Sequence, residues 1–292
     1  MRQLGLRFTV GLAVLLLAAS AGAQYRVRDD LGREVRFDAA PARVVSMLPS
    51  ITETVCALGA CGRLVGTDRY SNWPPEVASL PKAGGLDDAQ VERIVALHPD
   101  LVLLSGSARV TDRLAQLGVR TVAIDTDRYA DIARSITLVA QALGVPARAP
   151  PLQAQIEREV DALARSVQAA RHGQGPSVYF EVDESPYAAG PTSFIGELLT
   201  RLGARNIVPA SLGPFPRINP EFVVRADPEV IFVAPQDAPG LAQRPGWSGI
   251  RAVREHHICT LAGSQRDAVV RPGPRVAEGM RAIEACLEMV AP

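Results

Sequence analysis

Aromatic and charged residues gather in the glycine- and proline-rich loops that follow the predicted strands of this chain. The candidates for ligand contact in these loops are Tyr70, Tyr187, Phe215, Asp267 and Arg271. Aromatic side chains on loops are not needed for the core, whereas they can stack on a large planar ligand. Asp267 and Arg271 could address polar groups at its rim. The alternative is that single aromatic residues pack beneath their own loops or fill a hinge.

Sequence motifs of common enzymes are absent. The chain has no phosphate-binding Gly-x-x-x-x-Gly-Lys-Ser/Thr loop, no Gly-x-Ser-x-Gly nucleophile turn and no His-Glu-x-x-His zinc motif. None of the four histidines has a partner at metal-binding spacing. We therefore expect a binding protein with no enzymatic activity, no protein-held metal and no resident cofactor. An enzyme or chaperone on the same scaffold, or a sensor module, are the rival interpretations.

The charge balance and the first residues bear on partners and location. The 292 residues carry 31 Lys+Arg and 31 Asp+Glu, which argues against a nucleic-acid partner. Arg2 and Arg7 precede an apolar run over residues 8–19, which predicts a signal peptide over residues 1–23 with cleavage after Ala23. The run is too short to span a bilayer. We expect a periplasmic protein that is not embedded in the membrane and has no lipid anchor.

Four cysteines remain after export, and they allow three disulfide pairings. Proximity in the sequence favours Cys56 with Cys61 and Cys259 with Cys286. Buried free thiols are the alternative. In either case the cysteines are interpreted as structural.

Strands that alternate with helices predict an α/β fold. A predicted strand at residues 43–48 leads into Ser50-Ile51-Thr52-Glu53, which matches a Ser-x-x-Glu capping box at a helix start. Residues 152–170 have the apolar spacing of one long helix. The predicted organisation is a signal peptide at 1–23, an N-terminal lobe at 24–147, a connecting helix at 148–174 and a C-terminal lobe at 175–292.

An internal repeat indicates that the two lobes are related. Residues 92–104 match residues 221–233 at a constant offset of 129, and both segments read as a helix, a Pro-acidic turn and a buried strand. We therefore expect two pseudo-symmetric lobes. The crevice between them, where loops from strand ends face each other, is then the expected ligand site.

Several segments together resemble the class III periplasmic binding proteins, which deliver cobalamin, haem or ferric siderophores to ABC importers. These segments are residues 68–75, 91–102, 189–194 and 202–208, and the resemblance extends over about residues 40–290. The resemblance implies that each lobe is a mainly parallel central sheet wrapped by helices. It also implies that one long interlobe helix joins the lobes and that they close little around a ligand.

Within that family the resemblance favours cobalamin as the ligand. It implies that the cleft is lined by Tyr70, Leu86, Ser105, Tyr187, Phe215, Asp267 and Arg271. Leu86 and Ser105 stand where cobalamin binders of the family carry tryptophans. A ferric siderophore is the alternative, because Arg69, Arg217 and Arg271 could meet an anionic chelate. Haem is less favoured, because the loop at residues 83–86 offers no tyrosine.

The resemblance also assigns a partner. Glu92 and Glu221, equivalent under the offset of 129, match two family glutamates that dock onto arginines of the permease dimer of an ABC importer. A two-fold pore needs two equivalent contacts. Each glutamate would also be favoured by the dipole at the start of its helix. We expect a monomer that serves the importer's permease and its ATPase subunits.

Overall fold

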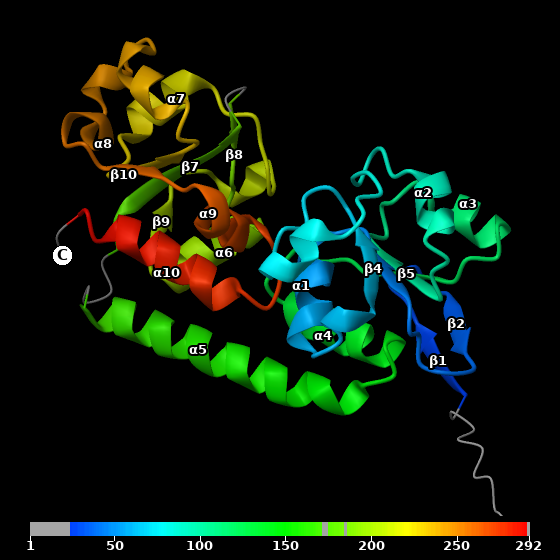
Figure 1. The fold of residues 1–292 in the computed structure, drawn as a ribbon. Coiled ribbons are helices and arrows are strands. Elements are labelled where there is room, and N and C mark those ends of the chain that lie inside the picture. Colours follow the sequence, from blue (N-terminus) through cyan, green and yellow to red (C-terminus); the bar gives the residue numbers. More distant parts are fainter. Residues whose placement is uncertain (1–23, 171–174, 184–185, 291–292) are drawn as a thin grey trace, which may run out of the picture.

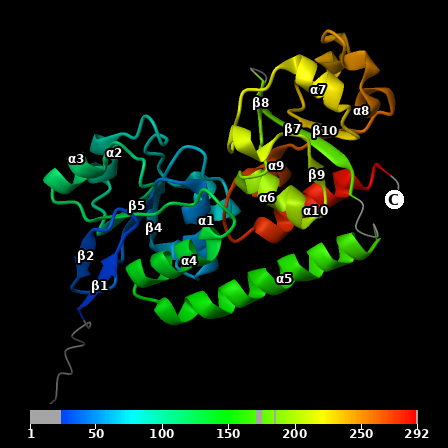
Figure 2. The ribbon, with the colours of Figure 1, turned by 180° about the vertical axis from the view of Figure 1, so that it is seen from behind.

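The computed structural model describes residues 24–170, 175–183 and 186–290, and the predicted signal peptide lies outside these residues. Two lobes lie side by side, and the long helix α5 (Ala149–Ala170) runs along the base of both (Figures 1 and 2). Helices surround a mainly parallel sheet in each lobe, so the predicted α/β fold of two lobes is confirmed. No helix among the described residues is long and apolar enough to cross a membrane.

The N-terminal lobe is built on a four-stranded parallel sheet in the order β4-β3-β5-β6. Its strands are β3 (Val44–Ser46), β4 (Leu64–Thr67), β5 (Leu101–Leu104) and β6 (Thr121–Ala123), with an N-terminal hairpin of β1 (Tyr25–Arg28) and β2 (Glu34–Phe37). Its helices are α1 (Pro49–Ala57), α2 (Val91–Ala96), α3 (Thr111–Gln116) and α4 (Asp131–Ala142). Every residue of β5 is buried, as expected for an apolar strand inside a parallel sheet.

The C-terminal lobe repeats this plan. Its strands are β7 (Ser177–Asp183), β9 (Arg205–Asn206), β10 (Val230–Val233) and β11 (Ile258–Thr260), with β8 (Tyr187–Ala188) antiparallel to β7. Its helices are α6 (Phe194–Arg201), α7 (Pro220–Ala226), α8 (Arg251–Arg254), α9 (Gly263–Val270) and α10 (Val276–Leu287). Short 3-10 helices in both lobes span Cys61–Arg63, Pro75–Ser79, Pro146–Arg148, Ala210–Leu212, Ala238–Gln243 and Trp247–Gly249.

The predicted repeat is visible in the backbone. The order β4-β3-β5-β6 in one lobe corresponds to β9-β7-β10-β11 in the other, and all of these strands are parallel. Helices α2 and α7 begin 129 residues apart, as do strands β5 and β10. The turn between helix and strand contains a residue with positive φ in both lobes, His98 at 47° and Asp227 at 44°. The two lobes therefore share one local construction.

A carboxylate after this turn anchors the neighbouring strand in each lobe. Asp100 accepts hydrogen bonds from the backbone N–H groups of Ala42 and Arg43, at 2.9 and 2.8 Å. Glu229, 129 residues later, accepts one from the backbone N–H of Ser177 at 2.7 Å. These bonds satisfy backbone donors where β3 and β7 begin, so the acidic residue of each turn aligns two strands.

The start of α1 differs from the prediction. The N-cap residue is Leu48, no side chain caps the helix, and Pro49 occupies the first turn, so the predicted Ser50–Glu53 capping box is wrong. Proline suits this position because its ring sets a helical φ and the N–H it lacks would have no partner within the helix. Glu53 is buried instead, and its carboxylate meets arginines of the other lobe.

The described structure pairs the cysteines as the sequence favoured. Cys56–Cys61 closes the turn after α1, and Cys259–Cys286 ties β11 to α10. Helix α5 begins at Ala149, inside the predicted connecting segment of residues 148–174, and two prolines lie in its first turn. It packs against α4 of one lobe and α10 of the other, so it contacts both.

Candidate functional site

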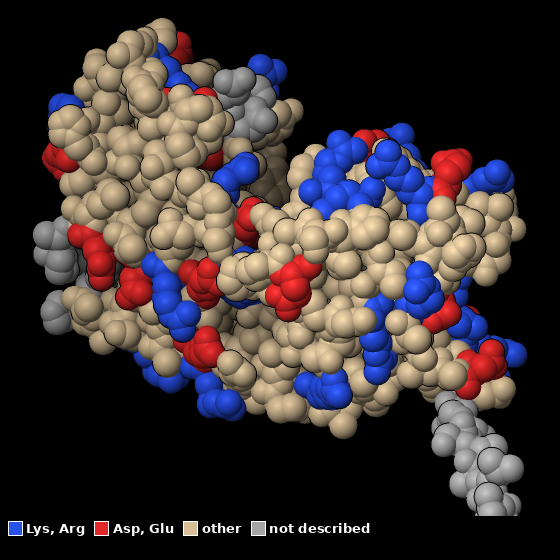
Figure 3. Space-filling view, viewed as in Figure 1, with Lys and Arg blue, Asp and Glu red and all other residues tan. Residues whose placement is uncertain are grey.

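A cavity of about 400 Å³ opens between the two lobes. Figure 3 shows the molecular surface hollowed where they meet. The N-terminal wall includes Tyr70, Leu86, Ser105 and Asp127, and the C-terminal wall is formed by α9 and the residues that follow it. On the N-terminal side these loops follow the carboxyl ends of parallel strands, where ligands of open α/β sheets bind.

Five of the seven predicted ligand-contact residues line this cavity: Tyr70, Leu86, Ser105, Asp267 and Arg271. Tyr187 and Phe215 are not among its lining residues, and their side chains are 43% and 49% exposed. Strand β8, which carries Tyr187, lies on the side of its lobe that faces the N-terminal lobe (Figures 1 and 2). Ligand contact by all seven residues stays a prediction.

Tyr70 is held out toward solvent by a buried polar network beneath its loop. Its side chain is 61% exposed, while Asp68 and Ser71 beside it are buried. The Asp68 carboxylate accepts hydrogen bonds from the backbone N–H groups of Tyr70 and Ser71, at 2.7 and 3.1 Å, and from the Ser71 hydroxyl. An Asp that bonds to the following backbone fixes such a turn.

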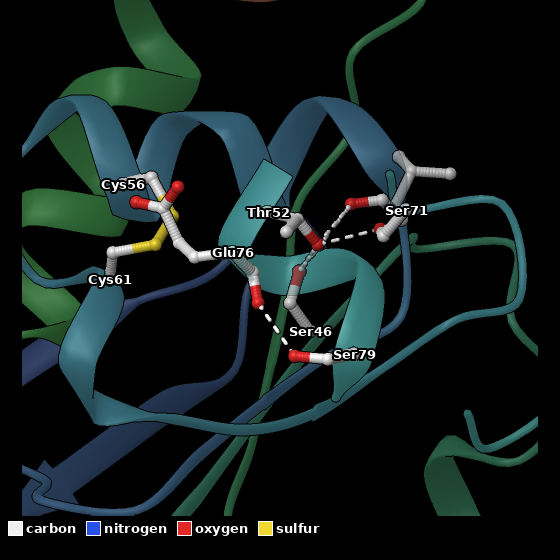
Figure 4. Close-up of a disulfide and its surroundings, with 8 residues drawn as sticks. Ser46, Thr52, Cys56, Cys61, Ser71, Glu76 and Ser79 are labelled. Carbon is white, nitrogen blue, oxygen red and sulfur yellow. Dashed lines mark hydrogen bonds between the residues drawn. A yellow bond between two sulfur atoms is a disulfide. The ribbon is translucent and has the colours of Figure 1, made fainter. Parts of the chain in front are cut away.

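Helix α1 supports the same loop through hydroxyl groups. Thr52 donates to Ser46 Oγ at 2.8 Å, and its hydroxyl lies 2.9 Å from that of Ser71 (Figure 4). Lys82 donates to the Ser71 carbonyl at 2.6 Å from the other side. Burial raises the pKa of Asp68 and lowers the pKa of Lys82. Strand β3, helix α1 and the loop all contribute to this network. The backbone of Tyr70 is therefore fixed in position.

Arg271 joins the two lobes behind Tyr70. Its guanidinium donates to Glu53 on α1 at 2.8 Å, to the side-chain oxygen of Asn72 at 2.9 Å and to the Tyr70 carbonyl at 3.0 Å. It also forms an ion pair with Asp267 at 3.0 Å. Arg271 is only 8% exposed. Its charge is therefore already neutralised by protein groups.

Arg275 completes this cluster. It lies 3.5 Å from the Glu53 carboxylate and over the ring of Trp73, 4.4 Å from the centroid. Asn72 donates to Asp267 at 2.8 Å, which adds a direct bond between the lobes. Burial raises the pKa of Glu53 despite the opposing effect of both arginines. We call Glu53, Asn72, Asp267, Arg271 and Arg275 the interlobe clamp.

The sequence did not reveal most of the clamp. The sequence pattern predicts Glu53 as part of a helix cap, although in this short helix it is buried together with its neighbours, where a charged residue requires a buried partner. The partners are 218 residues apart in the case of Glu53 and Arg271, so no local pattern links them.

Glu92 and Glu221 occupy equivalent places on the two lobes. Each lies in the first turn of its helix, α2 or α7, and each is exposed. Figure 1 shows these two helices on the upper side of the molecule, one in each lobe, away from α5. The arrangement suits a partner that contacts both lobes at once.

Comparison with known proteins identifies relatives over nearly the whole chain. Residues 44–264 match the family described as periplasmic binding protein. An uncharacterized ABC transporter substrate-binding lipoprotein of Bacillus subtilis is 28% identical over 275 residues, covering 91% of this chain and 85% of the relative. A vitamin B12-binding protein of Vibrio parahaemolyticus is 26% identical over 251 residues, covering 84% of this chain and 88% of the relative.

A solved structure supports the same grouping. The apo form of a periplasmic haem-binding protein from Roseiflexus superposes with a TM-score of 0.74 at 28% sequence identity, covering 84% of this chain and 97% of that protein. Two of these three relatives are named for the ligand that they bind, which is vitamin B12 in one and haem in the other.

Proposed function

Because the chain belongs to the periplasmic binding protein family, we propose that it captures a cobalamin-class corrinoid between its lobes and delivers it to an ABC importer. The family serves ABC importers as substrate-binding components, and the matched relatives are binding proteins, not enzymes. The proposal includes an extracytoplasmic location after loss of residues 1–23, a monomeric state and no enzymatic activity.

The interlobe cavity is the observation that supports corrinoid capture most directly. It is open, lined by both lobes, and has the exposed ring of Tyr70 on one wall. An aromatic ring presented by a fixed loop can pack on the face or edge of a macrocycle at little cost in conformational entropy. The vitamin B12-binding relative supports cobalamin as the first choice.

A ferric chelate, as haem or a siderophore complex, is the second candidate. Tyr70 is the observation that favours it, because a phenol lines the cavity and phenolate oxygen can ligate ferric iron. The haem-binding relative points the same way. The two candidates differ in what they require of Tyr70: a corrinoid needs its ring, whereas an iron ligand needs its oxygen.

Equilibrium titrations with cyanocobalamin, hemin and a ferric siderophore test this proposal. We expect the tightest binding with cyanocobalamin, and we expect Tyr70→Phe to keep it within about threefold because the ring remains. Tight binding of hemin or the ferric chelate alone, abolished by Tyr70→Phe with loss of a phenolate-to-iron absorption band, would establish the second candidate instead.

Docking on the importer belongs to the same proposal. Glu92 and Glu221 would each meet a basic group of the permease, one from each lobe. Their exposure and their equivalent places in α2 and α7 support this assignment.

A further inference from the structure

Because the interlobe clamp engages Arg271, a ligand in the cavity would meet a different cation. Arg271, the residue directly after α9, is buried and bonded to protein groups, but Arg266 within α9 is exposed and lines the cavity. Among the described residues, no side-chain hydrogen bond or ion pair engages the Arg266 guanidinium. It is therefore a charge available on the C-terminal wall.

The opposite wall carries the opposite charge. Asp127 lines the N-terminal side of the cavity and is exposed. Burial raises the pKa of Asp127, and the nearby Asp125 and Asp131 add to this effect while Arg134 opposes it. An anionic group of a ligand would be repelled there and drawn toward Arg266.

A small side pocket adjoins Arg266. A hollow of about 40 Å³ lies between α9 and the carboxyl ends of β7, β10 and β11, and Arg266 and Val270 line both this hollow and the interlobe cavity. Phe180, Phe232 and Val269 form much of its wall. Glu181, the acidic side chain among the described residues of that wall, accepts two hydrogen bonds from Arg244 at 2.7 and 2.9 Å. The pocket thus offers apolar surface for a short group beside the arginine.

We propose that Arg266 and this side pocket form a subsite that binds an anionic group of the ligand, a phosphodiester or carboxylate carried on a short apolar arm. The subsite rests on the proposed function, since it assigns the orientation of the same ligand in the same cavity. Arg266 is then a specificity-determining residue that selects ligands with negative charge at one edge. A guanidinium suits this role because it can donate two parallel hydrogen bonds to either anion.

Matched pairs of probes test the subsite on the full protein. The pairs are cyanocobalamin with dicyanocobinamide, which lacks the phosphodiester; hemin with its dimethyl ester; and a ferric tricatecholate with a neutral ferric trihydroxamate. The pair used is the one whose anionic member the unmodified protein binds. Affinities are measured for the unmodified protein, Arg266→Met and Arg266→Lys, with Arg165→Met as a control on exposed α5.

We expect Arg266→Met to weaken the anionic probe roughly tenfold and to leave the neutral probe unchanged. Arg266→Lys should recover most of the loss, and Arg165→Met should have no effect. Equal affinities of the unmodified protein and Arg266→Met for the anionic probe would overturn the subsite while leaving the proposed function intact. Failure of the unmodified protein to bind any probe would overturn the proposed function, and the subsite with it.

Discussion

A buried arginine at the junction of the lobes makes several contacts within the protein. Arg271 lines the cavity, yet its guanidinium contacts Glu53, Asn72, Asp267 and the Tyr70 carbonyl. Its bond to the Tyr70 carbonyl helps to fix the loop that presents the Tyr70 ring to the cavity. Arg266, five residues earlier and within α9, also lines the cavity and has no such partners among the described residues.

Glu53 should be the residue on which the interlobe clamp depends. We expect Glu53→Ala to lower the free energy of unfolding by about 3 kcal/mol, because two buried arginines lose their shared counter-charge. Glu53→Gln should lose less, since an amide oxygen can still accept from Arg271. Urea denaturation measures both. A loss below about 1 kcal/mol for Glu53→Ala would show that the clamp contributes little.

At the level of single residues, the sequence predicted part of the site. Tyr70, Leu86 and Ser105 could be placed on loops near the crevice from local pattern and family resemblance, and they line the cavity. Asp267 also lines it, but it lies in helix α9 and not, as predicted, in a loop. Which arginine is free for a ligand could not be predicted. That depends on contacts between residues about two hundred positions apart, which periodicity does not encode.

Among the elements, the repeated helix-turn-strand unit was the most predictable part of the fold. Its apolar strand and Pro-acidic turn are local signals, and the structure places α2 with β5 and α7 with β10 at the predicted offset. The start of α1 was predicted wrongly. The Ser-x-x-Glu pattern there competes with Pro49, whose fixed φ begins the helix two residues earlier.

Glu229 should make the stability of the C-terminal lobe depend on pH. Burial alone would raise the pKa of Glu229, but hydrogen bonds from Ser177 and the charges of Arg251 and Arg205 outweigh it and lower the pKa below the usual value. A carboxylate with a lowered folded pKa stabilises the fold at neutral pH. That contribution is lost as pH falls from the ordinary glutamate value through the lowered one.

Glu229→Gln should therefore cost about 1–2 kcal/mol at pH 7, and the difference from the unmodified protein should shrink as the solution is acidified through that window. Denaturation at several pH values measures it, with the exposed Glu288→Gln as control. A difference that stays constant with pH would contradict the assignment.

The two disulfides should contribute unequally. Cys259–Cys286 closes a sequence separation of 27 and Cys56–Cys61 one of 5, so chain entropy predicts losses of about 3.5 and about 2 kcal/mol when each pair is replaced by serine. Thermal and urea unfolding of the two double variants measure this order. The reverse order would show that packing at α1, and not chain entropy, governs the shorter link.

Across the whole molecule, the lobes are joined at several places, including hydrogen bonds from Arg128 and the backbone N–H of Tyr129 to Glu197 on α6. Helix α5 spans the base, and the interlobe clamp connects α1 and the Tyr70 loop with the residues after α9 near the cavity. Separate connections restrict rotation of one lobe against the other more than a single hinge would. We therefore expect the cavity to change little on binding, which would lower the cost of ordering.

Docking on the importer would involve the whole molecule, because it uses one glutamate of each lobe. We expect the double variant Glu92→Ala with Glu221→Ala to bind ligand as the unmodified protein does but to reduce importer-dependent uptake roughly tenfold or more, because both charged contacts are lost. Glu157→Ala with Glu288→Ala removes the same charge from exposed positions on α5 and after α10 and should support normal uptake. Normal uptake by the first variant, or loss of ligand affinity, would exclude this docking role.

Calorimetric titration of the chain with cyanocobalamin, beside the same titration of Tyr70→Ala, tests the central claim most directly. Capture in the interlobe cavity predicts one site per chain and an affinity roughly tenfold weaker for Tyr70→Ala, since the variant loses the aromatic surface that lines the cavity. Absence of heat with the unmodified protein, or an affinity that Tyr70→Ala leaves unchanged, would contradict it.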